Sequence, residues 1–346
     1  MPDSLIATYR RRNRQRVMLL ALLTMLATLA LLLDLTTGPA GLPLDETLKA
    51  LTGMGEVARS TEVIVRDVRL PMALVALLVG AALALAGAEM QTVLENPLAE
   101  PFTLGVSAAA ALGAAVAIIL GLSLPFLPVA WSISTNAFLF ALGALALLQL
   151  LGRMRGGGPE VLILFGIALN FAAGAFLSLL QFIASADALQ QLVFWTMGSL
   201  TAATKTGAVL LLLVLGVTVP FSLRAAWRLT ALRMGEEQAR GFGVNVTALR
   251  RWALLRVSLL AASAVSMVGV IGFVGLAGPH IARMLVGEDH RYFLPASLLT
   301  GAVLMSLAST LSKVLVTGVL LPVGLVTSMI GLPVFFWLIL RGRAVR

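Results

Sequence analysis

The segment LPMALVALLVGAALALAGAEMQ, residues 70–91, decides the fold class. Its first 19 residues carry no charge, and the only ionisable side chain is Glu89 near the end. A helix needs about 20 consecutive, mainly apolar residues to cross the hydrocarbon core of a bilayer. The segment therefore predicts a membrane-spanning helix.

Similar apolar segments recur along the whole chain of 346 residues, which is 59% hydrophobic and 12% charged, whereas soluble domains carry about 25% charged residues. A soluble globule is excluded. The further predicted spans are 17–35, 103–121, 131–151, 161–182, 206–227, 252–272, 275–287, 292–315 and 322–340. The sequence thus predicts an all-α polytopic membrane protein with about ten transmembrane helices, of which 275–287 is too short to be assigned from hydropathy alone.

The basic residues predict the orientation of these spans. If both termini are cytoplasmic, 19 of the 25 Lys and Arg residues fall on the cytoplasmic side and six on the outer side, as the positive-inside rule requires. Most of the excess positive charge then marks topology and contacts anionic lipid, so nucleic acid is not needed as a partner. We expect a basic cytoplasmic tail at 1–16 and one transmembrane domain at 17–341. A cleaved signal peptide is the alternative for the N-terminal segment.

The residues contain no pattern typical of an enzyme active site. The chain has no cysteine and two histidines, neither in a metal-binding pattern, so we expect no metal site and no cofactor. The three lysines follow Leu, Thr and Ser, which excludes the Gly-Lys-Ser/Thr end of a phosphate-binding loop. The acidic residues lie near span ends or in loops, although Glu89 keeps an ion-coupled carrier open. We expect a conduit that takes its energy from another chain.

The longest polar interruption, 229–250, contains a predicted short helix. Gly235 and Gly243 bracket it, with Met234, Ala239 and Phe242 on an apolar side. The charge distribution places it in the cytoplasm. The residues alone favour a solvated loop helix without a partner, and a docking element for a cytoplasmic motor is the alternative.

Two further segments interrupt the spans. Pro97 and Pro101 force a turn after the span 70–91, which the residues alone favour as a simple turn over a gate. The glycine-rich stretch 269–278 predicts irregular backbone at membrane depth, which survives only where protein or water covers it. His280 follows this stretch, and we favour a packed histidine over a ligand contact.

Many blocks over residues 60–343 together resemble the FecCD-type permeases, the membrane subunits of bacterial ABC importers for iron-siderophores, haem and cobalamin. The blocks are Arg69-Leu70-Pro71, Gly80 to Gly87, Asn96-Pro97-Leu98-Ala99, Leu104-Gly105-Val106-Ser107, Trp195 with Met197-Gly198-Ser199, Gly235-Glu236 with Ala239 and Gly243, Gly272 to Leu276, Pro279-His280, Asp289-His290-Arg291, and Leu321-Pro322-Val323-Gly324 with Gly331 and Pro333.

The resemblance implies a type II ABC importer permease in the bacterial inner membrane. Its partners would be a cytoplasmic ABC ATPase dimer, a periplasmic substrate-binding protein and a second permease subunit, identical or paralogous. Import by ATP-driven alternating access would bring in a metal chelate, with a ferric siderophore as our first expectation and haem or cobalamin as alternatives. An ion-coupled carrier and a non-transporting scaffold are the competing classes.

The resemblance also implies roles for individual residues. ATPase coupling would involve Gly235, Glu236, Glu237, Ala239, Arg240 and Gly243. A cytoplasmic gate would include Asn96, Pro97 and Leu98. Arg69 and Lys313 would dock the binding protein, unless they merely reach toward lipid headgroups. The sequence departs from the family pattern at Met72, Ser309 and Leu320, which bears on docking.

Overall fold

The computed structural model describes residues 2–39, 41–125, 128–154, 157–316 and 318–342, and every regular element in these ranges is helical. Arg155, Arg343 and Arg346, which belong to the cytoplasmic set predicted above, lie outside the described residues. The elements are α1 (Pro2–Thr36), α2 (Leu44–Thr52), α3 (Arg59–Val63), the π-helical η1 (Ile64–Arg69), α4 (Leu70–Val93), α5 (Val106–Leu120), the 3-10 turn η2 (Val129–Trp131), α6 (Ser132–Met154), α7 (Pro159–Ile183), α8 (Ala186–Thr196), α9 (Lys205–Leu232), α10 (Glu236–Gly241), α11 (Val246–Val268), α12 (Val274–Val286), α13 (His290–Val314) and α14 (Val323–Gly342).

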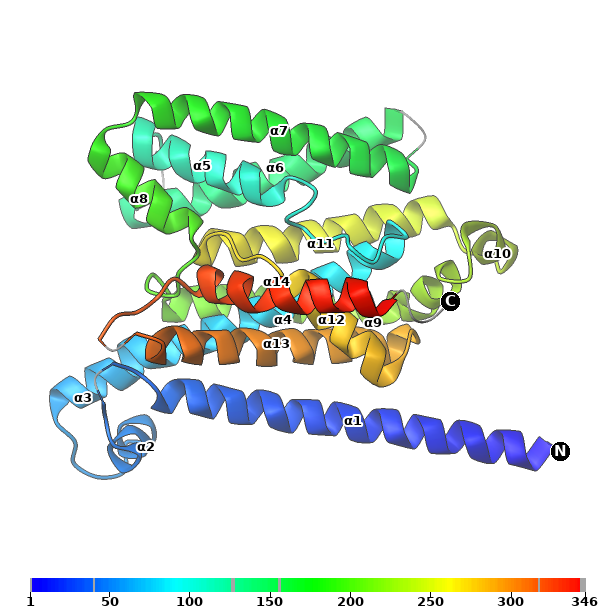
Figure 1. Cartoon of the computed structure of the whole chain (residues 1–346), viewed down its shortest axis with the longest axis horizontal. Helices are drawn as coiled ribbons and strands as arrows, with labels where there is room; N and C mark the ends of the chain where they lie inside the picture. The colour runs from blue at the N-terminus through cyan, green and yellow to red at the C-terminus, as the bar shows by residue number, and fades with distance from the viewer. Residues whose placement is uncertain (1, 40, 126–127, 155–156, 317, 343–346) are drawn as a thin grey trace.

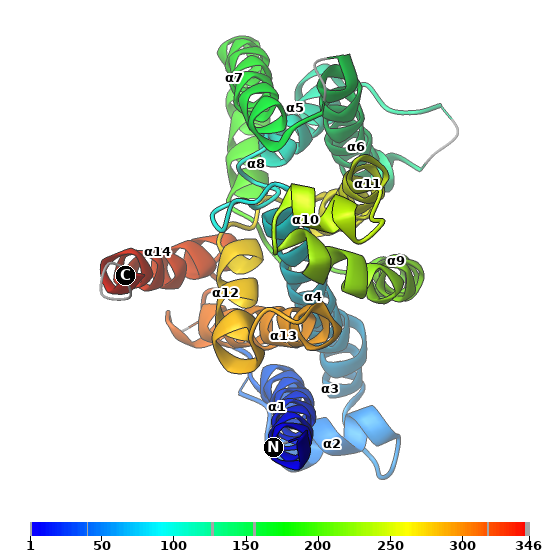
Figure 2. The same ribbon diagram turned by 90° about the vertical axis from the view of Figure 1, so that its right-hand side faces the viewer.

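Helix α4 is the centre of the molecule. It continues α3 and η1 without a break, and nearly all of its residues are buried. Helices α9, α11, α12 and α13 surround it, as Figures 1 and 2 show. This segment, whose sequence decides the fold class, therefore lies inside the bundle rather than against lipid.

Glycines let the backbones around α4 approach closely. A methyl group at Gly80 would lie 2.2 Å from the carbonyl oxygen of Gly301 on α13, and one at Gly87 would lie 1.8 Å from that of Gly275 on α12. No side chain fits at such distances. Small residues at these crossings are the usual way to pack helices tightly where lipid provides no hydrophobic driving force.

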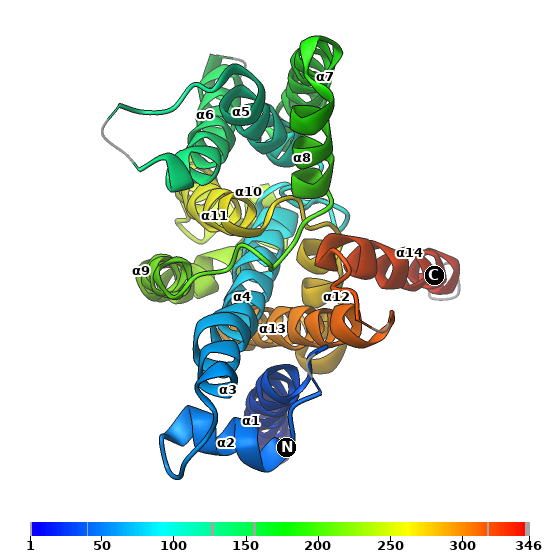
Figure 3. The ribbon, with the colours of Figure 1, turned by 90° about the vertical axis from the view of Figure 1, so that its left-hand side faces the viewer.

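Two groups of helices flank this core. Helices α5, α6 and α7 form a layer on one side, which α8 joins at one end (Figures 1 and 3). On the opposite side α1 runs along α13. Both α1 and α7 are mostly exposed and apolar, as expected of helices that face lipid or another membrane subunit.

Seven helical segments in the described residues are long and apolar enough to cross a membrane: α1 from Ile6, α3 to α4, α6, α7, α9, α11 and α13. Three shorter apolar helices, α5, α12 and Val323–Pro333 of α14, coincide with the remaining predicted spans. At 1.5 Å per residue, the 13 residues of α12 extend about 20 Å, against a hydrocarbon core of about 30 Å. The number of ten spans thus stays a prediction.

The molecule has two distinct ends. The N-terminal end of α1, the C-terminal end of α14 and α10 lie at one of them, which we call the α10 end; α2, α3 and α8 lie at the other, the α2 end (Figures 1 and 3). The distribution of arginines predicts that the α10 end is cytoplasmic.

Candidate functional site

The predicted helix between Gly235 and Gly243 is confirmed as α10. Both glycines have positive φ angles, +113° and +81°, which L side chains rarely adopt, so glycine permits the turns that begin and end this element. Figure 2 views the molecule from the α10 end and shows α10 projecting between α9 and α11.

The two sides of α10 differ in exposure. Ala239 is completely buried and holds the helix against the body of the protein. Glu237 and Arg240 are exposed, and so are the apolar side chains of Met234 (57%) and Phe242 (56%) beside them. Of the residues assigned to coupling, Glu237 and Arg240 are thus directly accessible to a partner, whereas Ala239 is not.

Glu236 is half-buried and faces Arg250 rather than solvent. Its carboxylate accepts hydrogen bonds from Arg250 Nη2 at 3.1 Å and from Arg240 Nη2 at 2.5 Å. Burial opposes ionisation of this carboxyl, but the hydrogen bonds and charges of the two arginines outweigh it and hold the pKa of Glu236 below its ordinary value. Glu236 therefore stays ionised and ties α10 to α11.

The turn after α4 is closed by its own polar groups. Glu95 adopts a left-handed conformation with φ of 51°, and the amide of Asn96 donates to the carbonyl oxygen of Gln91 at 3.1 Å, which ends the helix as in a Schellman motif. The side chain of Asn96 then accepts from the amide of Leu98 at 2.9 Å. Leu98 is 49% exposed. The predicted turn is confirmed, and its role as a gate stays a prediction.

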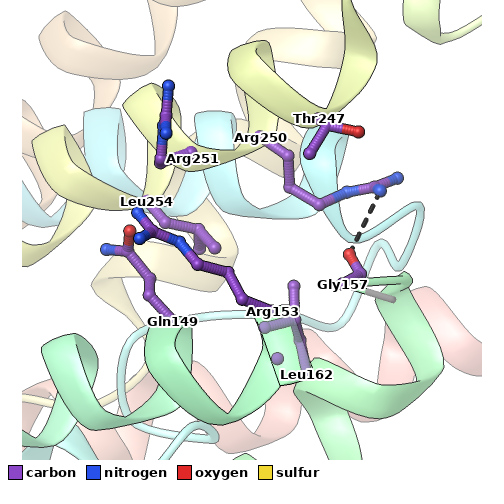
Figure 4. Close-up of a pocket in the computed structure, with 9 residues that line it drawn as sticks. Gln149, Arg153, Gly157, Leu162, Thr247, Arg250, Arg251 and Leu254 are labelled. Carbon is purple, nitrogen blue, oxygen red and sulfur yellow. Dashed lines mark hydrogen bonds between the residues drawn. The ribbon is translucent and has the colours of Figure 1, made fainter. Parts of the chain in front are cut away.

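Arg250 connects three separate parts of the chain. It is 5% exposed and donates from Nε to the carbonyl oxygen of Val93 at 2.9 Å, from Nη1 to that of Gly157 at 3.3 Å and from Nη2 to Glu236. Figure 4 shows the contact with Gly157. The end of α4, the α6–α7 connection and α10 thus share one guanidinium. The sequence alone does not reveal this role, because Arg250 is one of several arginines around α10 and two of its partners, Val93 and Gly157, lie 157 and 93 positions away in the chain.

The turn between α12 and α13 anchors the residues just before α10. Arg233, which follows α9, donates to Glu288, and Arg283 of α12 lies 3.4 Å from the same carboxylate. His290 contacts Thr92 of α4 at 2.8 Å and Thr230 of α9 at 3.2 Å. The segment that leads into α10 is therefore fixed to α12 and α13.

Glu100 is a buried carboxyl that the sequence did not single out. It is 8% exposed, and Gly275 at the start of α12 packs against it, since a methyl group there would lie 3.3 Å from Oε2. Burial raises the pKa of Glu100 to about 7, although the backbone amide of Phe273 donates to it. Phe273 itself has a φ of 68°, consistent with the irregular backbone predicted for this stretch.

Glu89, which kept an ion-coupled carrier open, is neutralised inside the bundle. Arg256 Nε lies 2.9 and 3.0 Å from its two carboxylate oxygens, and Nη2 lies 2.5 Å from Oε2. Among the described residues, no group of three or more His, Asp or Glu side chains is placed to hold a metal ion. Glu89 and Asp34 lie near the ends of α4 and α1, as expected of the acidic residues, and both are completely buried.

Arg69 and Lys313 meet at the α2 end but are not on its surface. Each is 4% exposed. Lys313 Nζ donates to the side chain of Asp34 at 2.7 Å and to its carbonyl oxygen at 2.9 Å, while Arg69 Nη1 donates to the carbonyl oxygen of Thr36 at 3.1 Å. In this conformation both cations hold the end of α1, and their predicted docking role requires access that the observed packing does not provide.

The whole arrangement has counterparts among known proteins. The FecCD transport family profile matches residues 24–341. The chain belongs to the FecCD transport family. It is 40% identical to the hemin transport system permease protein HmuU of Yersinia pestis over 280 residues, which are 81% of this chain and 84% of that protein. It is 34% identical to the vitamin B12 import system permease protein BtuC of Salmonella typhi over 333 residues, 96% of this chain and 98% of that protein.

A solved structure agrees with this assignment. An inward-facing conformation of a transporter assigned to the metal-chelate ABC type matches with a TM-score of 0.82 and 32% identity over 93% of this chain and 99% of that one. FecCD permeases are transport subunits and not enzymes. The protein is accordingly a multi-pass ABC importer permease of the inner membrane.

Proposed function

We propose that this FecCD permease imports a metal chelate from the periplasm to the cytoplasm by ATP-driven alternating access. The observation that carries the proposal is the position of Arg250, whose guanidinium joins α10 to the end of α4 and to the α6–α7 connection. A short exposed helix fixed to two other connections by one buried side chain is suited to pass on a movement imposed from outside.

In the proposed mechanism an ATPase subunit binds α10 and moves it during its nucleotide cycle. Glu236 pulls Arg250, and Arg250 displaces the Asn96–Leu98 turn and the segment at Gly157. Differential ATPase affinity for two permease conformations then shifts their populations. The exposed Leu98 would belong to the cytoplasmic closure in one of the two states.

The ATPase contact would use the exposed part of α10. Glu237 and Arg240 offer charges, and Met234 and Phe242 offer apolar area beside them. An interface with an apolar centre and a charged rim has this composition. Gly235 and Gly243 allow α10 to project, and Ala239 anchors it.

The substrate-binding protein would dock at the α2 end. The side chains of Lys49 and Lys205 are 48% and 59% exposed there, in ion pairs with Asp45 and Asp67, and they would exchange these carboxylates for those of an acidic partner. Arg69 and Lys313 lie behind them and would contact that partner only after the end of α1 moves. A second permease subunit, identical or paralogous, would cover apolar residues such as Phe171 and Phe182 on α7, which are 73% and 88% exposed.

For the cargo we propose a ferric siderophore, with haem and cobalamin as the alternatives. A chelate in general is supported by the two relatives that carry haem or vitamin B12 and by the metal-chelate type of the matching structure. The experiment therefore offers all three chelates in parallel.

The test is uptake into liposomes that contain the permease with its ATPase and binding protein. We expect uptake of ferric siderophore that requires ATP and both partners. Preferential uptake of haem or cobalamin would show that the proposed cargo is wrong but would leave the proposed mechanism in place. Uptake driven by a proton or sodium gradient without ATP would contradict the proposed mechanism, as would its complete absence with every chelate.

A further inference from the structure

A basic pocket lies at the α10 end, between the last turn of α6, the α6–α7 connection and the first turns of α11. It encloses about 210 Å³. It is lined by Gln149, Gly152, Arg153, Gly157, Leu162, Thr247, Arg250, Arg251 and Leu254 (Figure 4). The lining contains three arginines and no carboxylate, so the pocket selects for an anion.

Two of the three arginines have no ion-pair or hydrogen-bond partner among the residues that the structure describes. Arg250 is occupied by Glu236 and by two carbonyl oxygens. Within the described ranges Arg153 forms no ion pair, and the contact of Arg251 there is a cation–π interaction with Trp252 at 5.9 Å. Figure 4 shows Arg153 and Gln149 extending together from α6 toward α11, whereas the side chain of Arg251, at the edge of the pocket, extends from α11 away from these two residues.

The start of α11 adds to the positive potential. Thr247 is the second residue of this helix of 23 residues and lines the pocket. The first turn of a helix carries a partial positive charge, which favours phosphate groups; in α11 the side chain of Asn245 already caps the amide of Ala248 at 2.9 Å, and the partial charge of the turn remains. The side chains and the helix end thus act in the same direction on the same cavity.

The neighbouring surface identifies the kind of anion. Leu150 and Met154 on α6 are 56% and 74% exposed, and Trp252 and Leu255 on α11 are 56% and 39% exposed. Exposed apolar side chains along transmembrane helices face acyl chains, and tryptophan concentrates at the level of lipid headgroups. A water-soluble anion would gain nothing from this apolar surface, whereas a lipid matches both parts.

We infer that this pocket binds the phosphate of an anionic phospholipid, with Arg153 and Gln149 as donors, Arg251 adding positive charge at the edge of the pocket, and the acyl chains along the exposed side chains of α6 and α11. Basic pockets between helix ends on the cytoplasmic side commonly hold such headgroups. Gly157 and Arg250 both line the pocket, and Arg250 also contacts Glu236 of α10, so a bound lipid would brace the α6–α7 connection against α10. The binding itself does not depend on the proposed cargo.

The test compares lipid retention by the purified full-length permease in native mass spectrometry. The probes are phosphatidylglycerol and phosphatidylcholine with identical acyl chains. We expect preferential retention of phosphatidylglycerol, about fivefold weaker in Arg153→Gln and about 25-fold weaker in Arg153→Gln/Arg251→Gln, if each arginine contributes about equally. Arg228→Gln is the matched control, since Arg228 is an exposed arginine at the same end of the molecule on α9 and does not line the pocket.

Other outcomes would overturn the inference. Equal retention of both lipids, or equal loss of phosphatidylglycerol in Arg228→Gln, would reduce the effect to general surface charge. Displacement of the lipid by inorganic phosphate alone would assign the pocket to a soluble anion. Unchanged lipid retention in the double variant together with lost ATPase binding would assign the arginines to that protein interface.

Discussion

Glu89 on α4 and Arg256 on α11 form a buried ion pair with all polar contacts between 2.5 and 3.0 Å. Glu89 is completely buried and Arg256 is 8% exposed. Each buried charge therefore depends on the other for its stabilisation. The pair cross-links two helices that both lead toward α10.

Removing one member of this pair should destabilise the protein far more than removing both. Glu89→Leu or Arg256→Met leaves a buried charge unpaired, which typically costs 3–5 kcal/mol, whereas an apolar pair of similar volume is often neutral. We expect the double variant to recover most of the loss in chemical unfolding measured in detergent. A double variant whose loss of stability equals the sum of the two single losses would contradict the cross-link.

Arg250 should be required for coupling rather than for assembly. Arg250→Lys keeps the charge but not the planar set of donors that reaches Val93, Gly157 and Glu236 together. We expect transport to fall by about tenfold or more while ATPase subunits still bind, corresponding to the loss of one or more hydrogen bonds to a charged group at 1.5–3 kcal/mol each. Arg228→Lys serves as control and should transport normally. Loss of ATPase binding in Arg250→Lys would refute this division of roles.

The two neighbouring glutamates of α10 should behave differently. Glu237 is exposed, so Glu237→Arg should reverse the charge that a partner meets and abolish ATPase association in a pull-down without unfolding the permease. Glu236→Gln should preserve association and weaken transport, because it loses the ionic contact with Arg250. Normal association in Glu237→Arg would argue against α10 as the ATPase contact.

Glu100 should make stability depend on pH. Its pKa is about 7 in the folded protein against an ordinary value of 4.5, so between these values the folded state holds a proton that the unfolded state has released. The free energy of unfolding should therefore fall as pH rises through this window, by roughly 3 kcal/mol at most. Unfolding curves in detergent at several pH values measure this slope, and Glu100→Gln should remove its share. An identical slope in the variant would disprove the assignment.

The left-handed residue after α4 offers a stabilising substitution. Glu95 has a φ of 51°, a conformation that costs an L side chain about 1 kcal/mol relative to glycine. Glu95→Gly should therefore unfold at higher denaturant concentration than Glu95→Ala, which loses the same carboxylate but keeps the strain. The comparison between the two variants separates the backbone effect from the contact of Glu95 with Arg250, whose atoms lie 3.6 Å apart.

The long helices could be predicted from the sequence because the pattern that indicates them, a run of apolar residues, lies within each segment. An apolar run such as 70–91 indicates by itself that the segment lies in a membrane. The glycines on both sides of α10 indicate where a helix begins and ends. The amphipathic helix α2 and the helix α8 went unpredicted, since short elements outside the spans carry no hydropathy signal strong enough to distinguish them from loops.

The partners of the charged residues could not be predicted for a different reason. Glu89 and Arg256 are 167 positions apart, and Asp34 and Lys313 are 279 apart, so only the packing of the helices brings them together. The position of Lys313 at the end of a span predicts a surface residue, because the sequence does not show that α1 packs beside it. Arg69 is likewise buried because the end of α1 packs against it, and a charged residue in the sequence does not by itself indicate such a contact.

The glycine crossings of α4 also restrict how the protein changes shape. Carbonyl oxygens of Gly301 and Gly275 occupy the space that a side chain at Gly80 or Gly87 would need. Sliding α4 lengthwise would drive side chains on the same face, such as Ala84, into the opposing backbone, so we expect α4, α12 and α13 to move as one rigid piece. The rearrangement during a transport cycle is then taken up where this piece meets the layer of α5 to α8, and that boundary is the place for distance probes.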